Sequence, residues 1–432
     1  MIRLFLPIAA LLLSDALLII GHGALLTLLP LRAEREGFAT AAIAATASAY
    51  FAGFVAGCLL APWLLRRVGH IRAFAALAAL FASATLALHA LPSLPAWLAL
   101  RFWLGLCIAG LYTVIESWLN GVTGREARGL VLSAYMVINL LMIVAGQQLL
   151  ALASPHSETL FLLAAIFVCL SIVPVSLTRA LSPAPPERQP LAWGRIWELS
   201  HAALVGAAAA GLVTGAFWAL GPVFAREAGL DAAGVGLFVS GAVLGGALFQ
   251  LPLGRLSDWL DRRVVLLGVA VAGALSSLAL LVVAAEPALL PLFALPWGGT
   301  TMTVYAICLA HATDHADPRE LTMVGSGILL AFGVASALGG PLAAVGVAVL
   351  GSGGLFAFCA AVQLGLAVYL ALRRRRHPLP LVDTTEGFHA MAESSPAALA
   401  LDPRAEEPPP PRPAPWESAH SHGGEGGGDV QT

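Results

Sequence analysis

Apolar residues in this chain gather into twelve long runs that are separated by short polar segments. Each run is roughly 20 residues long, which is the helix length needed to cross about 30 Å of hydrocarbon. The pattern therefore predicts an all-α membrane protein with twelve transmembrane helices. We expect these helices at residues 4–30, 41–64, 71–90, 97–119, 129–153, 159–179, 200–224, 232–254, 263–284, 287–311, 321–349 and 354–372.

The composition supports a lipid bilayer as the main partner. Hydrophobic residues make up 59% of the 432 residues and charged residues only 11%, whereas a soluble protein has about 25% charged residues. A formal net charge of −2 gives no basis for binding nucleic acid. All basic residues are arginine, so the chain has no phosphate-binding loop of the G-x-x-x-x-G-K-S/T kind, and ATP is not the expected energy source.

The arginines indicate which ends of the helices face the cytoplasm. If the N-terminus is cytoplasmic, the inner segments carry 17 arginines and the outer loops carry only Arg32, Arg35 and Arg226. Positive charge collects on the inner side of membrane proteins. We therefore expect both termini in the cytoplasm.

The chain divides into two halves that resemble each other. A Pro-rich polar stretch at 181–198 is expected to be a cytoplasmic linker between helical units at 1–180 and 199–375, and the Pro-, Ser- and Gly-rich tail at 376–432 is expected to be disordered. Parallel repeats of this kind place a site between the halves near the midplane and allow rocking around it. At an offset of 192 residues the matching positions are Gly23 and Gly215, Pro30 and Pro222, Gly37 and Gly229, and Gly53 and Gly245.

The most specific motif follows the eighth predicted helix. It reads Gly254-Arg-Leu-Ser-Asp258-Trp-Leu-Asp-Arg262-Arg263 and is similar to the pattern G-x-L-x-D-R-x-G-R-R of the major facilitator superfamily. The first half keeps Leu64, Arg67 and Gly69 but has Arg66 where the acid belongs. The chain thus resembles this superfamily over about residues 1–375. Within the superfamily, the segment YTVIESWLN is similar to the YcaD-like bacterial branch.

The resemblance implies a secondary active transporter with the superfamily fold of two pseudo-symmetric six-helix bundles. Such a protein moves a small solute across the bacterial cytoplasmic membrane by alternating access. We expect a monomer without a cofactor and not an enzyme, since the His311, Asp314, His315 and Asp317 cluster is better interpreted as a gate or a solvated loop. A sensor or scaffold that is related to transporters is the alternative function.

A cytoplasmic gate is expected at the inner ends of the helices. A carboxylate there can bind arginines in one conformation and release them in another. The alternative for the arginines is that they only anchor the topology. For Glu116, pairing with Arg66, Arg67 or Arg128 is preferred over binding substrate. The candidate gate residues are Arg66, Arg67, Glu116, Arg128, Asp258, Arg262 and Arg263.

Three ionisable residues within the predicted helices are candidates for proton coupling. Asp15 and His22 lie seven residues apart, about 10 Å along one helix, and either could carry a proton or hold neighbouring helices together. Arg101 is expected about one turn below the outer interface, where its side chain reaches water. Superfamily relatives often have an arginine followed by glycine here, as Arg101 and Gly105 are, and use it in proton coupling.

Aromatic and amide side chains complete the candidate substrate site. Tyr112 and Tyr305 occupy matching places in the two halves, and a phenol can both stack on a substrate and hydrogen-bond it. Trp218 is a similar candidate. Asn139 either faces the cavity or bonds a neighbouring helix. The direction of transport stays open, although the fifth predicted helix lacks the proline of the drug-antiporter signature.

Overall fold

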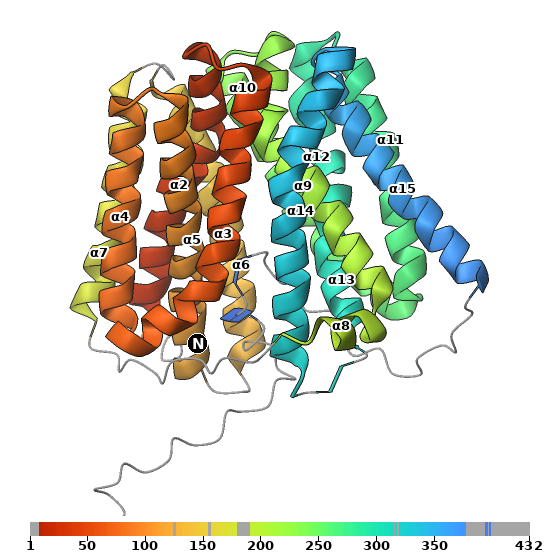
Figure 1. Cartoon of the computed structure of the whole chain (residues 1–432), viewed down its shortest axis with the longest axis horizontal. Coiled ribbons are helices and arrows are strands. Elements are labelled where there is room, and N and C mark those ends of the chain that lie inside the picture. The colour runs from red at the N-terminus through yellow and green to blue at the C-terminus, as the bar shows by residue number, and fades with distance from the viewer. Residues whose placement is uncertain are drawn as a thin grey trace, which may run out of the picture.

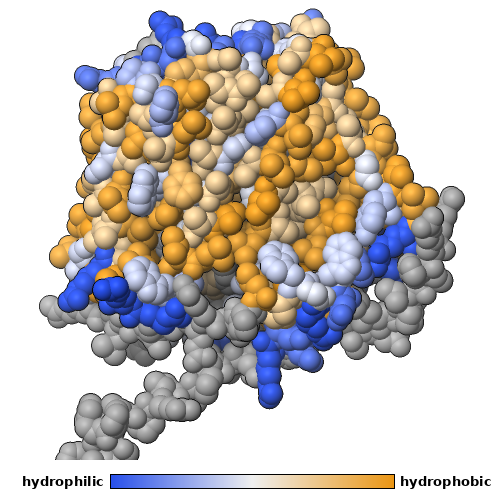
Figure 2. Space-filling model, in the orientation of Figure 1, coloured by the Kyte–Doolittle hydropathy of each residue, from blue (hydrophilic) through white to orange (hydrophobic). Residues whose placement is uncertain are grey.

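The computed structural model describes residues 8–123, 127–153, 157–178, 191–314, 316–317, 319–376, 394–395 and 397–398. Within these residues twelve helices, counting broken ones once, are long and apolar enough to cross a membrane, and no strand is present. The predicted all-α fold with twelve spans is confirmed. Figure 1 shows two groups of helices side by side, and Figure 2 shows a broad hydrophobic belt between two hydrophilic ends.

The first group contains six of these spans, and α6 continues into the short helix η2. Their bounds are α2 (Ala9–Arg35), α3 (Thr40–Val68), α4 (His70–Ala90), α5 (Leu94–Val122), α6 (Arg128–Gln148), η2 (Leu149–Ala151) and α7 (Glu158–Leu177).

The second group is preceded by the short helix α8, and its fourth span is broken. The bounds are α8 (Trp193–Leu199), α9 (His201–Glu227), α10 (Ala232–Trp259), α11 (Arg262–Val283), η3 (Pro287–Leu289), α12 (Leu290–Thr301), α13 (Thr303–Thr313), α14 (Leu321–Leu350) and α15 (Gly354–Arg376). The break at Met302 has no counterpart in α5, which runs unbroken at the matching place in the first half.

The sequence repeat is visible in the turns between helices. Gly37 and Gly229 both have positive φ, at 80° and 109°, and each follows the first helix of its half. Glycine adopts this conformation without a steric penalty. The repeat therefore reflects a shared local geometry.

Two helix pairs pack backbone against backbone, and the same contact occurs in each half. A Cβ atom built on Gly105 of α5 would lie 1.9 Å from the carbonyl oxygen of Tyr50 in α3. In the second half, a Cβ atom on Gly298 of α12 would lie 1.9 Å from the carbonyl oxygen of Ala242 in α10. Small residues allow membrane helices to approach this closely.

The two halves contact each other at the end opposite to the arginine-rich end. Arg226 at the end of α9 binds Glu34 at the end of α2, with Nη1 and Oε2 3.2 Å apart. Ser48 of α3 donates a 2.5 Å hydrogen bond to the carbonyl of Ala337 in α14. In α6, Gln148 donates a 2.9 Å bond to Ser240 of α10.

The expected linker is partly helical. Residues 179–190 lie outside the described residues, but α8 forms within 193–199 and its Ile196 is buried. Arg195 of α8 binds Glu320 at the start of α14 through contacts of 3.0 and 3.2 Å. The hydrogen bond from Arg195 lowers the pKa of the Glu320 carboxyl. These contacts attach the end of the linker to the second half.

Candidate functional site

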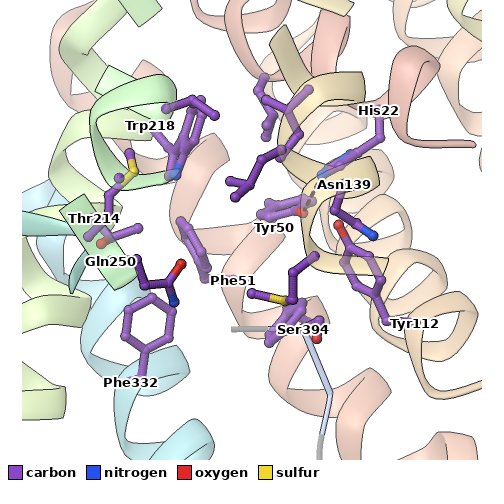
Figure 3. A pocket seen from close by; sticks show the side chains of 18 residues that line it. His22, Tyr50, Phe51, Tyr112, Asn139, Thr214, Trp218, Gln250, Phe332 and Ser394 are labelled. Carbon is purple, nitrogen blue, oxygen red and sulfur yellow. Dashed lines mark hydrogen bonds between the residues drawn. The ribbon is translucent and has the colours of Figure 1, made fainter. Parts of the chain in front are cut away.

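A cavity of about 200 Å³ lies between the two halves. Its walls combine aromatic rings with neutral polar groups that come from both halves (Figure 3). The described residues that line it are His22, Leu26, Tyr50, Phe51, Phe54, Tyr112, Met136, Asn139, Leu140, Ile143, Thr214, Trp218, Val243, Gly246, Gln250, Met302, Phe332 and Ser394.

The cavity is lined by equivalent positions of the repeat. Five of its residues have a partner 192 positions later that also lines it, so the cavity lies on the pseudo-symmetry axis. The pairs are His22 and Thr214, Leu26 and Trp218, Phe51 and Val243, Phe54 and Gly246, and Leu140 and Phe332.

Four of the predicted substrate residues line this cavity, namely His22, Tyr112, Asn139 and Trp218. Tyr305 is buried and packs edge-on against Phe332, with ring centroids 5.1 Å apart. It therefore supports the wall of the cavity from behind. Asp15 and Arg101 also lie behind the lining residues.

Sequence reasoning missed several lining residues, among them Tyr50, Phe332 and Gln250. Leu26 could have been found from the repeat, because it lies 192 positions before the predicted Trp218. No signal of this kind pointed to Ser394, because it lies in the tail that we expected to be disordered.

Arg101 is buried, contrary to our expectation that its side chain reaches water. Only 4% of the residue is exposed, whereas the neighbouring Trp103 is 49% exposed. The guanidinium lies over the Tyr50 ring at 4.7 Å from its centroid, and Nε donates a 3.4 Å bond to the carbonyl of Thr46. Attraction to the ring and to the carbonyl turns the side chain inward.

Tyr50 links this arginine to the cavity histidine. Its hydroxyl lies 3.3 Å from Nε2 of His22, and the two rings stack with centroids 6.0 Å apart. Phe81 packs edge-on against the other side of the imidazole at 5.9 Å. His22 is therefore held by α3 and α4, and its polar contact leads toward Arg101.

Two fully buried carboxylates are held by one face of α6. Asn139 donates a 2.8 Å hydrogen bond to Oδ2 of Asp15 in α2, and Tyr135 donates a 3.0 Å bond to Oε1 of Glu116 in α5. Asn139 lies one turn after Tyr135 and also donates to its carbonyl at 3.0 Å. Thus α6 connects the two acids through neutral groups.

The predicted ion pair between Glu116 and an inner arginine is not formed. The ion pairs of the described residues do not include Glu116, and Arg66 and Arg67 are exposed on α3. Arg67 lies over the Trp63 ring at 5.5 Å. Arg128 is buried at the start of α6. It lies about 10 Å along this helix from Tyr135, the residue that contacts Glu116. Arg128 and Glu116 therefore lie at different depths in the membrane.

The predicted gate motif of the second half forms contacts within its own half. Arg262 binds Asp314 at the end of α13 at 2.5 Å and Asp258 at 3.3 Å. Arg263 binds Asp261 at 2.9 Å. Asp258 near the end of α10 and Arg262 at the start of α11 therefore meet across the turn that joins these two helices.

A comparison with known protein families agrees with this architecture of two helical halves around a shared cavity. The model of the Major Facilitator Superfamily matches residues 11–201 and 203–422. The chain belongs to this superfamily. As a member, it is a multi-pass membrane transporter and not an enzyme.

Relatives agree with this assignment. The chain is 28% identical over 374 residues to an "Uncharacterized MFS-type transporter YcaD" of Escherichia fergusonii, covering 86% of this chain and 96% of the relative. It is 29% identical over 344 residues to the YcaD protein of Salmonella newport, covering 78% and 88%.

Solved structures share the fold at low sequence identity. A mutant of the nucleoside transporter NupG superposes with a TM-score of 0.73 at 12% identity, covering 84% of this chain and 98% of that protein. A D-xylose-proton symporter gives 0.63 at 13% identity, covering 84% and 96%. At this identity the likeness shows the fold alone.

Proposed function

We propose that this transporter carries a small neutral solute with an aromatic or other flat apolar surface, by alternating access across the bacterial cytoplasmic membrane. The observation that carries the proposal is the cavity between the halves. Its lining offers aromatic faces and uncharged hydrogen-bonding side chains, among them Asn139, Thr214 and Gln250. The described lining includes no arginine or acidic residue. A charged solute would lack a counter-charge there.

The contacts between the halves support an inward-facing state. Glu34 with Arg226, Ser48 with Ala337, and Gln148 with Ser240 all join the halves at the end that has few arginines. The positive-inside rule assigns this end to the outside.

One chain supplies both walls of the cavity, so the site needs no second copy of the protein. We therefore propose a monomer.

Proton coupling is part of the proposal, with Asp15 and Glu116 as the carriers. Both carboxylates are fully buried and have neutral hydrogen-bond donors in place of a cation. An ionised carboxylate in such a place is costly, and binding a proton removes that cost. Each acid is therefore suited to take up and release a proton as the cavity changes its exposure. His22, held by Tyr50, is the alternative carrier.

Counterflow in proteoliposomes tests transport itself. Vesicles that are preloaded with one solute from a panel of neutral aromatic metabolites are expected to accumulate the labelled form of the same solute transiently. Failure to exchange any solute of a broad panel, with or without a pH gradient, would contradict transport and favour the sensor or scaffold alternative.

Trp218 is expected to determine how tightly the solute binds. Trp218→Ala removes a cavity ring that is only partly buried, and an aromatic contact is worth about 0.5–1.5 kcal/mol beyond its buried area. The apparent KM for exchange should rise about ten-fold. Trp103→Ala is the matched control, because Trp103 is exposed on the outer surface of α5, and it should leave KM unchanged.

The bridge between Arg226 and Glu34 is expected to favour the inward-facing state slightly. The two side chains are 41% and 25% exposed, and exposed pairs contribute about 0.2–1 kcal/mol. Arg226→Glu should increase maleimide labelling of a cysteine placed at Thr214 from the outer side by up to about five-fold. Adding Glu34→Arg should reverse the increase. If the double variant labels as fast as the single one, the bridge does not hold this end closed.

A further inference from the structure

Part of the C-terminal tail is buried inside the first half of the protein. Ser394 is 4% exposed, Ser395 2%, Ala397 7% and Ala398 2%. Ser394 also lines the cavity between the halves (Figure 3). The composition of the tail predicts disorder. A specific contact must therefore hold these four residues in their buried position.

That partner is the carboxylate of Glu116. The hydroxyl of Ser394 donates to Oε1, and the hydroxyl of Ser395 donates to Oε2. With Tyr135 donating to Oε1 at 3.0 Å, the carboxylate accepts from three hydroxyl groups. Hydrogen bonds to an ionised acceptor are about twice as strong as bonds between neutral groups.

The tail residues are also arranged to make this contact. The backbone N–H of Ala397 donates a 3.1 Å bond to the hydroxyl of Ser395, and the N–H of Ala398 donates a 3.2 Å bond to its carbonyl. These bonds form a tight turn that fixes the direction of the Ser395 side chain. The side chains of Ala397 and Ala398 are buried together with the two serines.

The connection from α15 is long enough to reach this site. Positions 377–393 separate the last residue of α15 from Ser394, and a chain of this length spans up to about 60 Å when extended. Glu116 lies about 9 Å before the end of α5 at Val122. The connection is therefore long enough for Ser394 to contact Glu116 near the arginine-rich end of α5.

We propose that Glu116 is a binding site for paired hydroxyl donors, and that the chain's own Ser394 and Ser395 occupy it as an internal ligand that blocks the cavity from the cytoplasmic side. The blocking role rests on the proposed transport function, whereas the binding of the tail does not. A solute or partner that offers two adjacent hydroxyl donors would compete with the tail for the same carboxylate.

Cysteine labelling of the full chain tests the binding without any need for transport. The background is Cys169→Ser, because Cys169 is the exposed cysteine of the described residues. A cysteine introduced by Ala398→Cys should react with maleimide at least ten-fold more slowly than one introduced by Gln431→Cys. Adding Ser394→Ala and Ser395→Ala should remove this protection. Equal labelling of the two positions in the chain with both serines would overturn the binding site.

Counterflow tests the block. The full-length Ser394→Ala/Ser395→Ala variant is expected to exchange solute at least three times faster than the unmodified protein. The control variant is Ser418→Ala/Ser421→Ala, which removes two serines further along the tail and should leave the rate unchanged. A synthetic peptide of residues 390–402, added at the inner face, should slow the faster variant again.

The outcomes separate this inference from the proposed function. If no protein exchanges solute but Ala398→Cys is protected, transport fails and the binding site stands. If exchange occurs at equal rates with and without the two serines, transport stands and the block is overturned. Size-exclusion profiles that match the unmodified protein show that the variants fold.

Discussion

Accumulation driven by a pH gradient is expected to fall from roughly fifty-fold to near one in the Asp15→Asn variant. One proton moving down a pH gradient that is equivalent to about 100 mV supplies roughly 2.3 kcal/mol, which supports a gradient of that size. Asparagine keeps an oxygen that accepts the hydrogen bond from Asn139 but binds no proton. Exchange of labelled for unlabelled solute moves no net proton and should continue. Accumulation and exchange are measured in the same proteoliposomes.

Two variants make this test specific. Glu36→Gln removes a carboxyl just after the other end of α2, where Glu36 contacts Arg32, and it should keep full accumulation. His22→Ala tests the alternative carrier on the same helix. If Asp15→Asn and Glu116→Gln both accumulate solute normally, the assignment of the proton to these buried acids is wrong.

The Gly105→Ala variant is expected to be strongly destabilised. Its new methyl group would lie 1.9 Å from the carbonyl oxygen of Tyr50 and 2.8 Å from the backbone nitrogen of Phe54. Backbone cannot rotate away as a flexible side chain can, so α3 and α5 must separate. Overpacking of this kind costs about 1–3 kcal/mol or more. The melting temperature in detergent should fall by on the order of 5–10 °C.

A second glycine provides the matched control. Gly268 of α11 is also within a transmembrane helix, but a Cβ atom there has open space. Gly268→Ala should keep or raise the melting temperature, since alanine favours a helix by about 1 kcal/mol over glycine. Equal melting temperatures for Gly105→Ala and the unmodified protein would mean that α3 and α5 are not packed this closely.

The fold could be predicted because it follows from local patterns. Apolar runs place most helix ends within a few residues, as at Thr40 for α3 and Leu321 for α14. The break at Met302 could not be predicted in the same way. It lies within the predicted helix at 287–311, in the stretch Gly298-Gly-Thr-Thr-Met-Thr303, and glycine and threonine also occur where unbroken membrane helices pack against each other.

The candidate site was predicted less well because it depends on which side chains meet across helices. Charge alone suggested that Glu116 pairs with arginine, whereas the structure satisfies it with Tyr135, Ser394 and Ser395. A contact between residues about 280 positions apart leaves no local signal. Lining residues at equivalent positions of the repeat, such as Leu26 and Trp218, could have been predicted by comparing the sequences of the two halves.

The ion pair between Glu34 and Arg226 has a consequence for the origin of the two halves. These residues occupy equivalent positions of the repeat, 192 residues apart, and they face each other across the pseudo-two-fold axis. A symmetric dimer of identical six-helix units would place identical side chains against each other at this position. An acid would then face an acid. Opposite charges at one equivalent position therefore require two units that differ in sequence, which is what fusion into a single gene permits.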